Sequence, residues 1–135
     1  MNSSIWHTGT VIRGLGNGRK LGFPTANIRP DSPLELEKGV YAARIEIDGV
    51  RYKGMFYVGT RPSLGLTENT YEVHLLHFSG NLYGKTLSFE LMQFIRPEQK
   101  FESMEALVEQ LKKDLKFVDA YESFAEYKKK VHDQE

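Results

Sequence analysis

The chain contains no cysteine among its 135 residues. This absence excludes disulfide bonds, a cysteine nucleophile and cysteine-ligated zinc. No apolar run is long enough to form a membrane-spanning helix or the core of a signal peptide. Eighteen basic residues balance eighteen acidic ones, so the net positive charge that attracts nucleic acid or a membrane surface is missing. We therefore expect a cytoplasmic protein that binds neither membranes nor nucleic acid.

The length and composition are typical of one globular domain. Hydrophobic residues make up 40% of the chain and charged residues 27%, which is enough to form a core and disfavours disorder. Residues 1–6, "MNSSIW", look like a linker or an added junction as much as a native start. We predict that the domain proper covers residues 7–120 and that residues 121–135 form a helical extension.

The first part of the chain has the alternation and turn signals of an antiparallel β protein. Asp48-Gly49 is a strong two-residue hairpin signal between two alternating segments. Long loops are predicted at 14–38 and 59–69, because glycine and proline interrupt both segments. Several strands joined by hairpins indicate a barrel or a sandwich. The predicted strands are 7–13, 39–47, 51–58, 70–78 and 85–95.

The apolar period changes to that of a helix after Ser103, which is a plausible N-cap. Residues 123–133 can form a second short helix. The predicted apolar face of the first helix comprises Met104, Leu107, Val108, Leu111, Leu115 and Val118.

A glycine-rich segment, "GLGNGRKLGFPTAN", is the first candidate binding site. Glycines let backbone N–H groups approach a polyphosphate closely, and adjacent cations add positive charge. The segment is not a Walker A loop, because its lysine is not followed by serine or threonine. A plain loop remains an alternative. The residues concerned are Gly14, Gly16, Gly18, Arg19 and Lys20.

Thr25 and Asn27 end this segment with two oxygen-bearing side chains two positions apart. In an extended backbone such side chains point the same way, and Mg²⁺ prefers hard oxygen ligands. They can therefore supply two neutral ligands to a cation that also binds nucleotide phosphates. The alternative is that both side chains satisfy backbone groups in a loop.

Glu72 is the candidate general base. It lies in the predicted strand 70–78, and alternation places it on the face that carries His74, Leu76 and Phe78. A partly buried carboxylate there can take a proton from an attacking hydroxyl. A rim carboxylate paired with a nearby arginine or lysine is the alternative.

The segment "IRPEQKF", residues 95–101, joins the last predicted strand to the helix. Arg96, Glu98 and Lys100 can line a polar groove. Phe101 can either stack on a planar ligand or anchor the helix.

Taken together, these motifs resemble the riboflavin kinase (flavokinase) family of bacterial type. The resemblance implies a mainly β fold: a small antiparallel, Greek-key-like, six-stranded barrel with a C-terminal α-helix packed against it. It implies transfer of the γ-phosphoryl group of ATP to the 5′-hydroxyl of riboflavin, giving FMN and ADP. The matching segments occur in family order: "GTVIRGLGNGRKLGFPTANI", "GVYAARI", "VGTRPS", "YEVHLLHF", "LYGKTLSFEL" and "FIRPEQKFESMEALVEQLKKD".

The family's residue roles carry over to matching positions. Thr25 and Asn27 are implied to hold Mg²⁺ with the ATP phosphates, and Glu72 to activate the riboflavin hydroxyl. The glycine-rich segment, with its residues Gly14, Gly16, Gly18, Arg19 and Lys20, is implied to close over the nucleotide. The isoalloxazine pocket is implied to be shaped by Arg96, Glu98 and Phe101.

The resemblance also implies that the full-length protein can contain a second domain. In many bacteria such a domain is the C-terminal half of a bifunctional FAD synthetase, whose N-terminal half adenylylates FMN. Nothing in this sequence resembles that half, and we expect a monomer. Two other functions stay open: a non-catalytic flavin- or nucleotide-binding module, and a nucleic-acid-binding barrel of the OB type, which zero net charge disfavours.

Overall fold

The computed structural model of the chain describes residues 5–12, 25–63 and 66–133. Its chain divides into two compact units, Met1–Lys100 and Phe101–Glu135. The first unit contains the strands and the second contains the helix. In chain order the described elements are β1 (Trp6–Ile12), β2 (Ala26–Pro30), β3 (Gly39–Ile47), β4 (Val50–Ser63), β5 (Leu66–Leu75), β6 (Thr86–Pro97) and α1 (Met104–Asp133).

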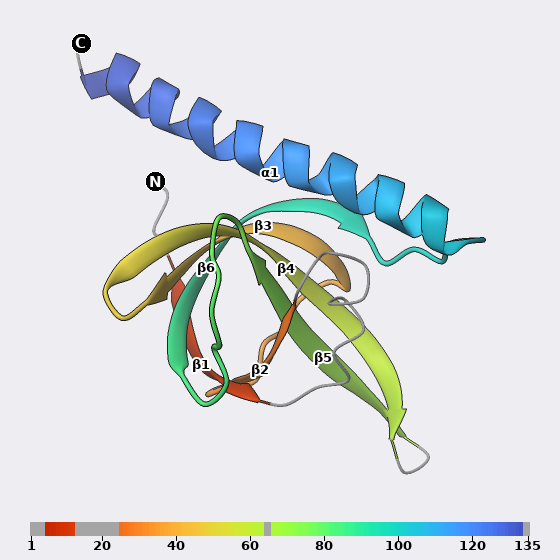
Figure 1. Cartoon of the computed structure of the whole chain (residues 1–135). Helices are drawn as coiled ribbons and strands as arrows, with labels where there is room; N and C mark the ends of the chain where they lie inside the picture. The colour runs from red at the N-terminus through yellow and green to blue at the C-terminus, as the bar shows by residue number, and fades with distance from the viewer. Residues whose placement is uncertain (1–4, 13–24, 64–65, 134–135) are drawn as a thin grey trace. The chain divides into compact units, whose positions relative to one another are not determined.

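The strands form a closed barrel in the order β1-β2-β5-β4-β3-β6 (Figure 1), and every neighbouring pair is antiparallel. Three consecutive strands, β3 to β5, are neighbours, and β6 returns to lie beside β3. This is Greek-key connectivity. The predicted fold class, a six-stranded antiparallel barrel followed by a helix, is confirmed.

The turn between β3 and β4 has the geometry predicted for it. Asp48 and Gly49 both have positive φ, 53° and 79°, and Ile47 pairs with Val50. Two left-handed residues in a two-residue loop match the right-handed twist of the strands on either side. The predicted strand 39–47 coincides with β3.

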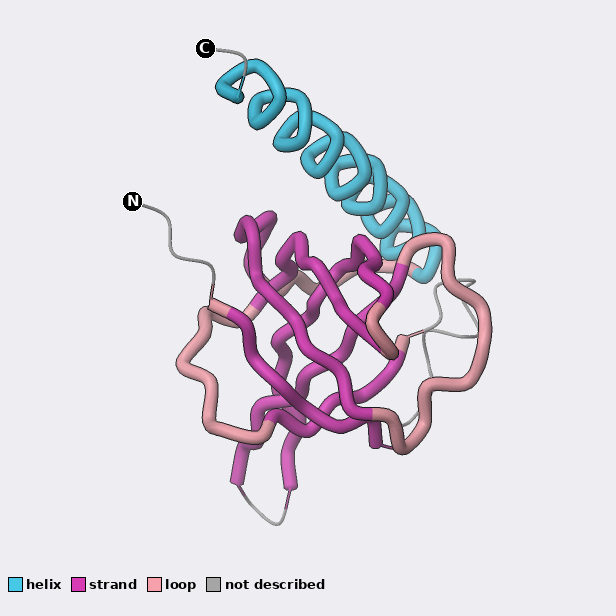
Figure 2. Tube along the Cα trace, turned by 90° about the vertical axis from the view of Figure 1, so that its left-hand side faces the viewer, coloured by secondary structure: helices cyan, strands magenta, loops and turns pink. Residues whose placement is uncertain are grey.

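Two segments predicted as loops contain strand. β2 lies within 14–38, and the hairpin of β4 and β5 continues through most of 59–69, pairing Gly59 with Thr70 and Ser63 with Leu66. Figures 1 and 2 show this hairpin projecting beyond the end of the barrel. The glycine and proline residues of 59–63 are accommodated because, in the described part of the chain, no strand pairs with the other side of β4 beyond Val58, which pairs with Gly39.

β5 ends earlier than predicted, at Leu75 instead of at 78. His77 has a φ of 55°, which turns the chain out of the extended conformation. Leu76 still follows the ladder, because its N–H donates a hydrogen bond to the Lys53 carbonyl at 2.9 Å, but Phe78 lies beyond the turn and packs against the core. Of the predicted common face of Glu72, His74, Leu76 and Phe78, only the place of Phe78 is therefore wrong.

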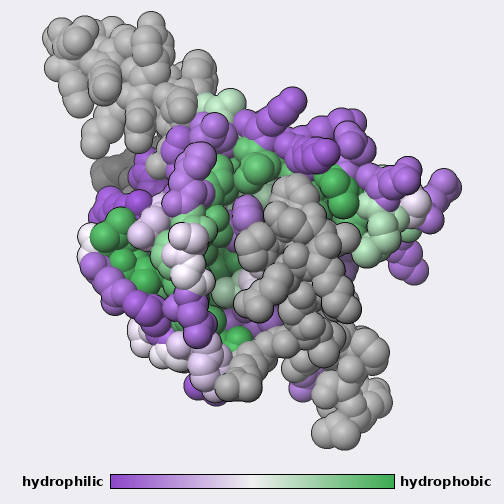
Figure 3. Space-filling view, viewed as in Figure 1, coloured by the Kyte–Doolittle hydropathy of each residue, from purple (hydrophilic) through white to green (hydrophobic). Residues whose placement is uncertain are grey.

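The inward-facing side chains of all six strands fill the barrel. Phe56 and Phe89 lie at its centre with 0% exposure, and their rings stack at 4.7 Å between centroids. Figure 3 shows hydrophobic residues exposed between hydrophilic ones on this face. The core residues are Val11, Ile28, Tyr41, Ala43, Ile45, Ile47, Phe56, Val58, Val73, Leu75, Leu87 and Phe89.

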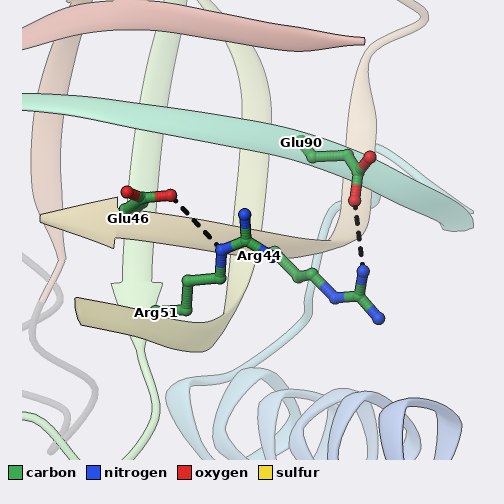
Figure 4. Close-up of polar contacts among 4 residues, drawn as sticks. All are labelled: Arg44, Glu46, Arg51 and Glu90. Atoms are coloured by element: carbon green, nitrogen blue, oxygen red, sulfur yellow. Dashed lines mark hydrogen bonds and ion pairs between the residues drawn. The ribbon is translucent and has the colours of Figure 1, made fainter. Parts of the chain in front are cut away.

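The outward-facing positions of β3, β4 and β6 carry charged side chains (Figure 4). Arg44 pairs with Glu90 across the strands at 3.6 Å, and Arg51 with Glu46 at 3.3 Å. Opposite charges at adjacent cross-strand positions support the register, although each such pair contributes about 1 kcal/mol or less.

α1 is one continuous helix, where the sequence suggested a first helix and a second short one at 123–133. Ser103 caps it as predicted, because its hydroxyl accepts a hydrogen bond from the Ala106 N–H at 3.1 Å. Met104 is 61% exposed, so its predicted place on the apolar face is wrong. Asp114 is instead a buried member of that face and accepts a hydrogen bond from Gln110 at 2.9 Å. No helix among the described residues is long and apolar enough to cross a membrane.

The stacked core pair generates a stability prediction. Phe89→Ala leaves a cavity beside Phe56, and we expect it to lower the free energy of unfolding by about 3–5 kcal/mol. Urea denaturation followed by circular dichroism measures this. Tyr83→Ala, at a 54% exposed aromatic, is the control and should change stability by less than about 1 kcal/mol. Equal losses in both variants would contradict the proposed core.

Tyr41 is a core residue whose phenol has a raised pKa. Burial first, and then the negative charge of Glu37, raise the pKa of its phenol above its usual value. The hydroxyl also donates a hydrogen bond to the Glu37 carbonyl at 2.7 Å. The folded protein therefore favours neutral Tyr41 more than the unfolded chain does. This contribution to stability is complete below about pH 10, where the unfolded phenol titrates, and is lost as the pH rises through the raised pKa.

We accordingly expect the urea midpoint of the wild type to fall faster than that of Tyr41→Phe above about pH 10. Ultraviolet absorbance titration should show that the variant loses a phenol whose pKa is raised. Parallel pH dependences for the two proteins would contradict the assignment.

Candidate active site

A row of outward-facing positions crosses five neighbouring strands of the barrel. Asn27 of β2 pairs with Glu72 of β5, and Glu72 pairs with Tyr57 of β4. The row continues through Val40 of β3 to Arg96 of β6. We call these positions the Glu72 row. The core residues Ile28, Val73, Val58 and Tyr41 are strand neighbours of its first four members, so these four face outward, and Arg96 joins the row through its pairing with Val40.

Thr25 lies immediately before β2 and completes a cluster with Asn27 and Glu72. Its hydroxyl donates a hydrogen bond to Glu72 Oε1 at 3.3 Å, although the two residues are 47 positions apart in sequence. All three side chains are half-buried. The structure thus brings together the three residues that sequence reasoning selected separately, and it does so through the pairing of β2 with β5.

The glycine-rich candidates Gly14, Gly16, Gly18, Arg19 and Lys20 lie outside the described residues. Their segment leaves the barrel after Ile12, the last residue of β1, and rejoins it at Thr25. Ile12 pairs with Asn27. Both points of attachment therefore lie at the β2 end of the Glu72 row.

The three candidates from "IRPEQKF" do not all lie in the same unit. Arg96 lies within β6, not in a loop as predicted, and is the last member of the Glu72 row. Glu98 reaches back over β4, with its Oε1 3.6 Å from the position that a Cβ on Gly59 would occupy. Phe101 belongs to the second compact unit and is half-buried. Arg96 and Glu98 thus both belong to the barrel unit that carries Glu72.

Sequence reasoning missed two positions beside these residues, Tyr57 and Gly59. Residues 51–58 were predicted as the second strand of the hairpin, with no role for Tyr57. Gly59 was assigned to a loop. The missing information is the β4–β5 register, which places Tyr57 opposite Glu72 and Gly59 opposite Thr70.

This arrangement combines a carboxylate, a hydroxyl and an amide within one small cluster. A carboxylate can accept a proton from an alcohol, and hydroxyl and amide oxygens suit a hard cation such as Mg²⁺. Among the described residues no group of three or more acidic or histidine side chains could hold a metal ion. The oxygens of Thr25 and Asn27 are too few to hold a cation alone. They therefore suit a cation whose remaining ligands come from a bound substrate.

Comparison with known proteins defines the family. The model of the flavokinase family, described as riboflavin kinase, matches residues 1–122. The chain therefore belongs to the riboflavin kinase family, and several of its relatives are bacterial proteins described as bifunctional. It is 40% identical over 114 residues to the bifunctional riboflavin kinase/FMN adenylyltransferase of Haemophilus influenzae, covering 84% of this chain and 37% of that protein.

Two further relatives have the same level of identity. The RNA-binding riboflavin kinase RibR of Bacillus subtilis is 38% identical over 112 residues, which are 82% of this chain and 48% of that protein. The trifunctional protein RibF/MnmA of Mycoplasmoides gallisepticum is 38% identical over 109 residues, which are 80% of this chain and 17% of that protein. The chain thus spans less than half of the length of each of these relatives.

Two solved structures share the fold. A Streptococcus pneumoniae protein described as a macrolide-efflux protein has a TM-score of 0.81 and 31% identity, covering 87% of this chain and 39% of that one. The riboflavin kinase of Trypanosoma brucei has a TM-score of 0.59 and 22% identity, covering 90% of this chain and 82% of that one. The second likeness concerns the fold alone.

Proposed function

We propose that this domain transfers the γ-phosphoryl group of ATP to the 5′-hydroxyl of riboflavin, giving FMN and ADP. The observation that carries the proposal is the Thr25–Glu72 hydrogen bond beside the Asn27–Glu72 strand pair, in a member of the riboflavin kinase family. It joins a proton acceptor to oxygen donors for a cation, which are the parts that phosphoryl transfer needs.

Glu72 acts as the general base. Its carboxylate takes the proton of the 5′-hydroxyl while the O5′–Pγ bond forms and the bond from Pγ to the bridging oxygen of ADP breaks. Thr25 holds one carboxylate oxygen, Oε1, by its hydrogen bond, which leaves Oε2 to receive the proton. The wall of the barrel fixes the backbone on which Glu72 stands, so little reorganisation is required.

Thr25 and Asn27 are the proposed protein ligands of Mg²⁺. A hydroxyl has one hydrogen and two lone pairs, so Thr25 can donate to Glu72 and still offer a lone pair to a cation. The side-chain carbonyl of Asn27 supplies a second neutral oxygen. A bound cation would neutralise charge on the ATP phosphates.

The remaining assignments concern the two substrates. The segment containing Gly14, Gly16, Gly18, Arg19 and Lys20 would bind the ATP phosphates, which is supported by its attachment points at Ile12 and Thr25. The "IRPEQKF" residues Arg96, Glu98 and Phe101 would contact the flavin. This is supported for Arg96 by its place in the Glu72 row and for Glu98 by its approach to Gly59.

We also infer that the full-length protein carries an N-terminal FMN adenylyltransferase domain and so contributes to FAD synthesis. The names of the bifunctional relatives and the share of their length that this chain spans support this inference. A cytoplasmic location, a monomeric state and the lack of nucleic-acid binding remain predictions.

The direct test incubates the purified domain with riboflavin, ATP and Mg²⁺ and separates the flavins by chromatography. We expect conversion of riboflavin to FMN, with ADP formed in equal amount. Tight flavin binding without conversion would instead identify a binding module and overturn the proposed reaction.

The role of Glu72 predicts a specific catalytic defect. Glu72→Gln and Glu72→Ala should lower kcat by about 10²- to 10⁴-fold, because a positioned general base contributes an effect of this size. Circular dichroism should show a folded protein. Glu46→Gln, at a more exposed carboxylate ion-paired with Arg51, is the matched control and should retain activity. Near-normal turnover in Glu72→Gln would remove Glu72 from the mechanism.

The proposed metal ligand predicts a substrate-selective defect. Asn27→Ala should weaken Mg-ATP binding about 10- to 100-fold, the range seen when a group supporting a bound metal is removed. Riboflavin binding should change far less in fluorescence titrations. Asn69→Ala, at an exposed asparagine in the outer part of β5, is the control. Equal losses for both substrates would indicate misfolding and count against the assignment.

A further inference from the structure

Strand glycines in this barrel divide into two kinds. At Gly9, Gly39 and Gly54, an added Cβ would lie less than 3.0 Å from core side chains or neighbouring backbone. At Gly9, for example, it would lie 2.8 Å from Ile28 Cγ2, and Gly39 also has a φ of 150°. Packing or backbone conformation explains why these three positions are glycine.

Gly59 in β4 is less constrained, because an added Cβ would be close only to the side-chain hydroxyl of Thr70, which can move, and not to the core or the backbone. Its φ is not in the left-handed region, and the nearest atoms to an added Cβ are Thr70 Oγ1 at 3.2 Å and Glu98 Oε1 at 3.6 Å. Glycine within a strand weakens the strand, and it often marks a place where a ligand or another backbone comes close. Here the space left by the missing side chain is bordered by two side-chain oxygens, so a polar ligand group would suit it.

This space lies next to the Glu72 row. Gly59 follows Tyr57 by two residues in β4, and Thr70 precedes Glu72 by two in β5, so all four positions share the outward face. The distance along the strands is roughly 6.6–6.8 Å, two residues of rise. The Tyr57 hydroxyl contacts Met55 Sδ at 3.7 Å, in the direction away from Gly59.

We propose that Gly59 is a specificity-determining residue, whose missing side chain leaves room for the polyol chain of the alcohol substrate between Thr70 and Glu98. The inference rests on the proposed function, in which the terminal hydroxyl of that chain reacts beside Glu72. The Glu98 carboxylate accepts hydrogen bonds from chain hydroxyls, and the Thr70 hydroxyl can donate or accept one. The two atoms nearest to the missing Cβ are both side-chain oxygens, which suits the hydroxyl groups of such a chain.

Steady-state kinetics of Gly59→Ala test the proposal. The added methyl group occupies the space, so KM for riboflavin should rise about 10-fold or more, while KM for ATP stays within about twofold. Gly9→Ala is the matched control: it should lower the melting temperature, because its Cβ meets Ile28, without changing KM for riboflavin. An unchanged KM for riboflavin in a folded Gly59→Ala variant would overturn the proposal.

Flavin binding without turnover separates this proposal from the proposed function. Fluorescence titration should show that Gly59→Ala weakens riboflavin binding but not binding of lumiflavin, which has a methyl group in place of the polyol chain. Equal weakening of both would place the ring at Gly59 and overturn the proposal. If the wild type binds riboflavin but forms no FMN, the kinase assignment fails, whereas the comparison of the two flavins still tests Gly59.

Thr70→Val removes the hydroxyl with little change of shape. We expect about 3- to 10-fold weaker riboflavin binding, the loss of one hydrogen bond, and no change for lumiflavin. Thr60→Val is the control, because Thr60 occupies the alternate face of the neighbouring strand and pairs with Asn69. Unaltered riboflavin affinity in Thr70→Val would contradict a role for the hydroxyl.

Discussion

The pairing of β2 with β5 is the constraint on which the rest of this structure depends. The ladder consists of two residue pairs, Ala26 with Val73 and Asn27 with Glu72, and it closes the barrel, because β1 already pairs with β6. One pair contains a core residue, Val73, and the other contains the candidate base. Closure of the barrel and assembly of the Thr25–Asn27–Glu72 cluster are therefore the same event. Such long-range pairing must overcome the entropy of closing the chain between residues 27 and 72.

Local sequence signals predicted the parts of the fold that depend on neighbouring residues. β3, the Asp48-Gly49 turn and the Ser103 cap each follow from short-range chemistry, and each was found where expected. β2 was missed because a five-residue strand ending in Pro30 lies among glycines and prolines that indicate a loop. The outer half of the β4–β5 hairpin was missed for the same reason. In both cases cross-strand hydrogen bonds, which a single segment does not reveal, outweigh local preference.

The candidate site was predictable as a set of residue types but not as a geometry. Thr25, Asn27 and Glu72 each had an ordinary structural explanation, and the resemblance to riboflavin kinases was needed to favour the catalytic one. The structure adds the hydrogen bond that links Thr25 to Glu72 and the register that places Tyr57 beside the carboxylate. The position of Arg96 was also not predictable from the sequence. It was expected in a loop but lies in β6, where it pairs with Val40 of the Glu72 row.

The alternation of Glu72 with Val73 along one strand has a consequence for how this domain tolerates change. A register slip of one residue in β5 would turn the carboxylate into the barrel and the valine out of it. Single-residue insertions or deletions within β2 or β5 should therefore abolish folding and the proposed catalysis together, whereas length changes between Ser63 and Leu66 should leave the register of the inner strands intact. Under the proposed function, activity is then a sensitive indicator of correct β2–β5 pairing.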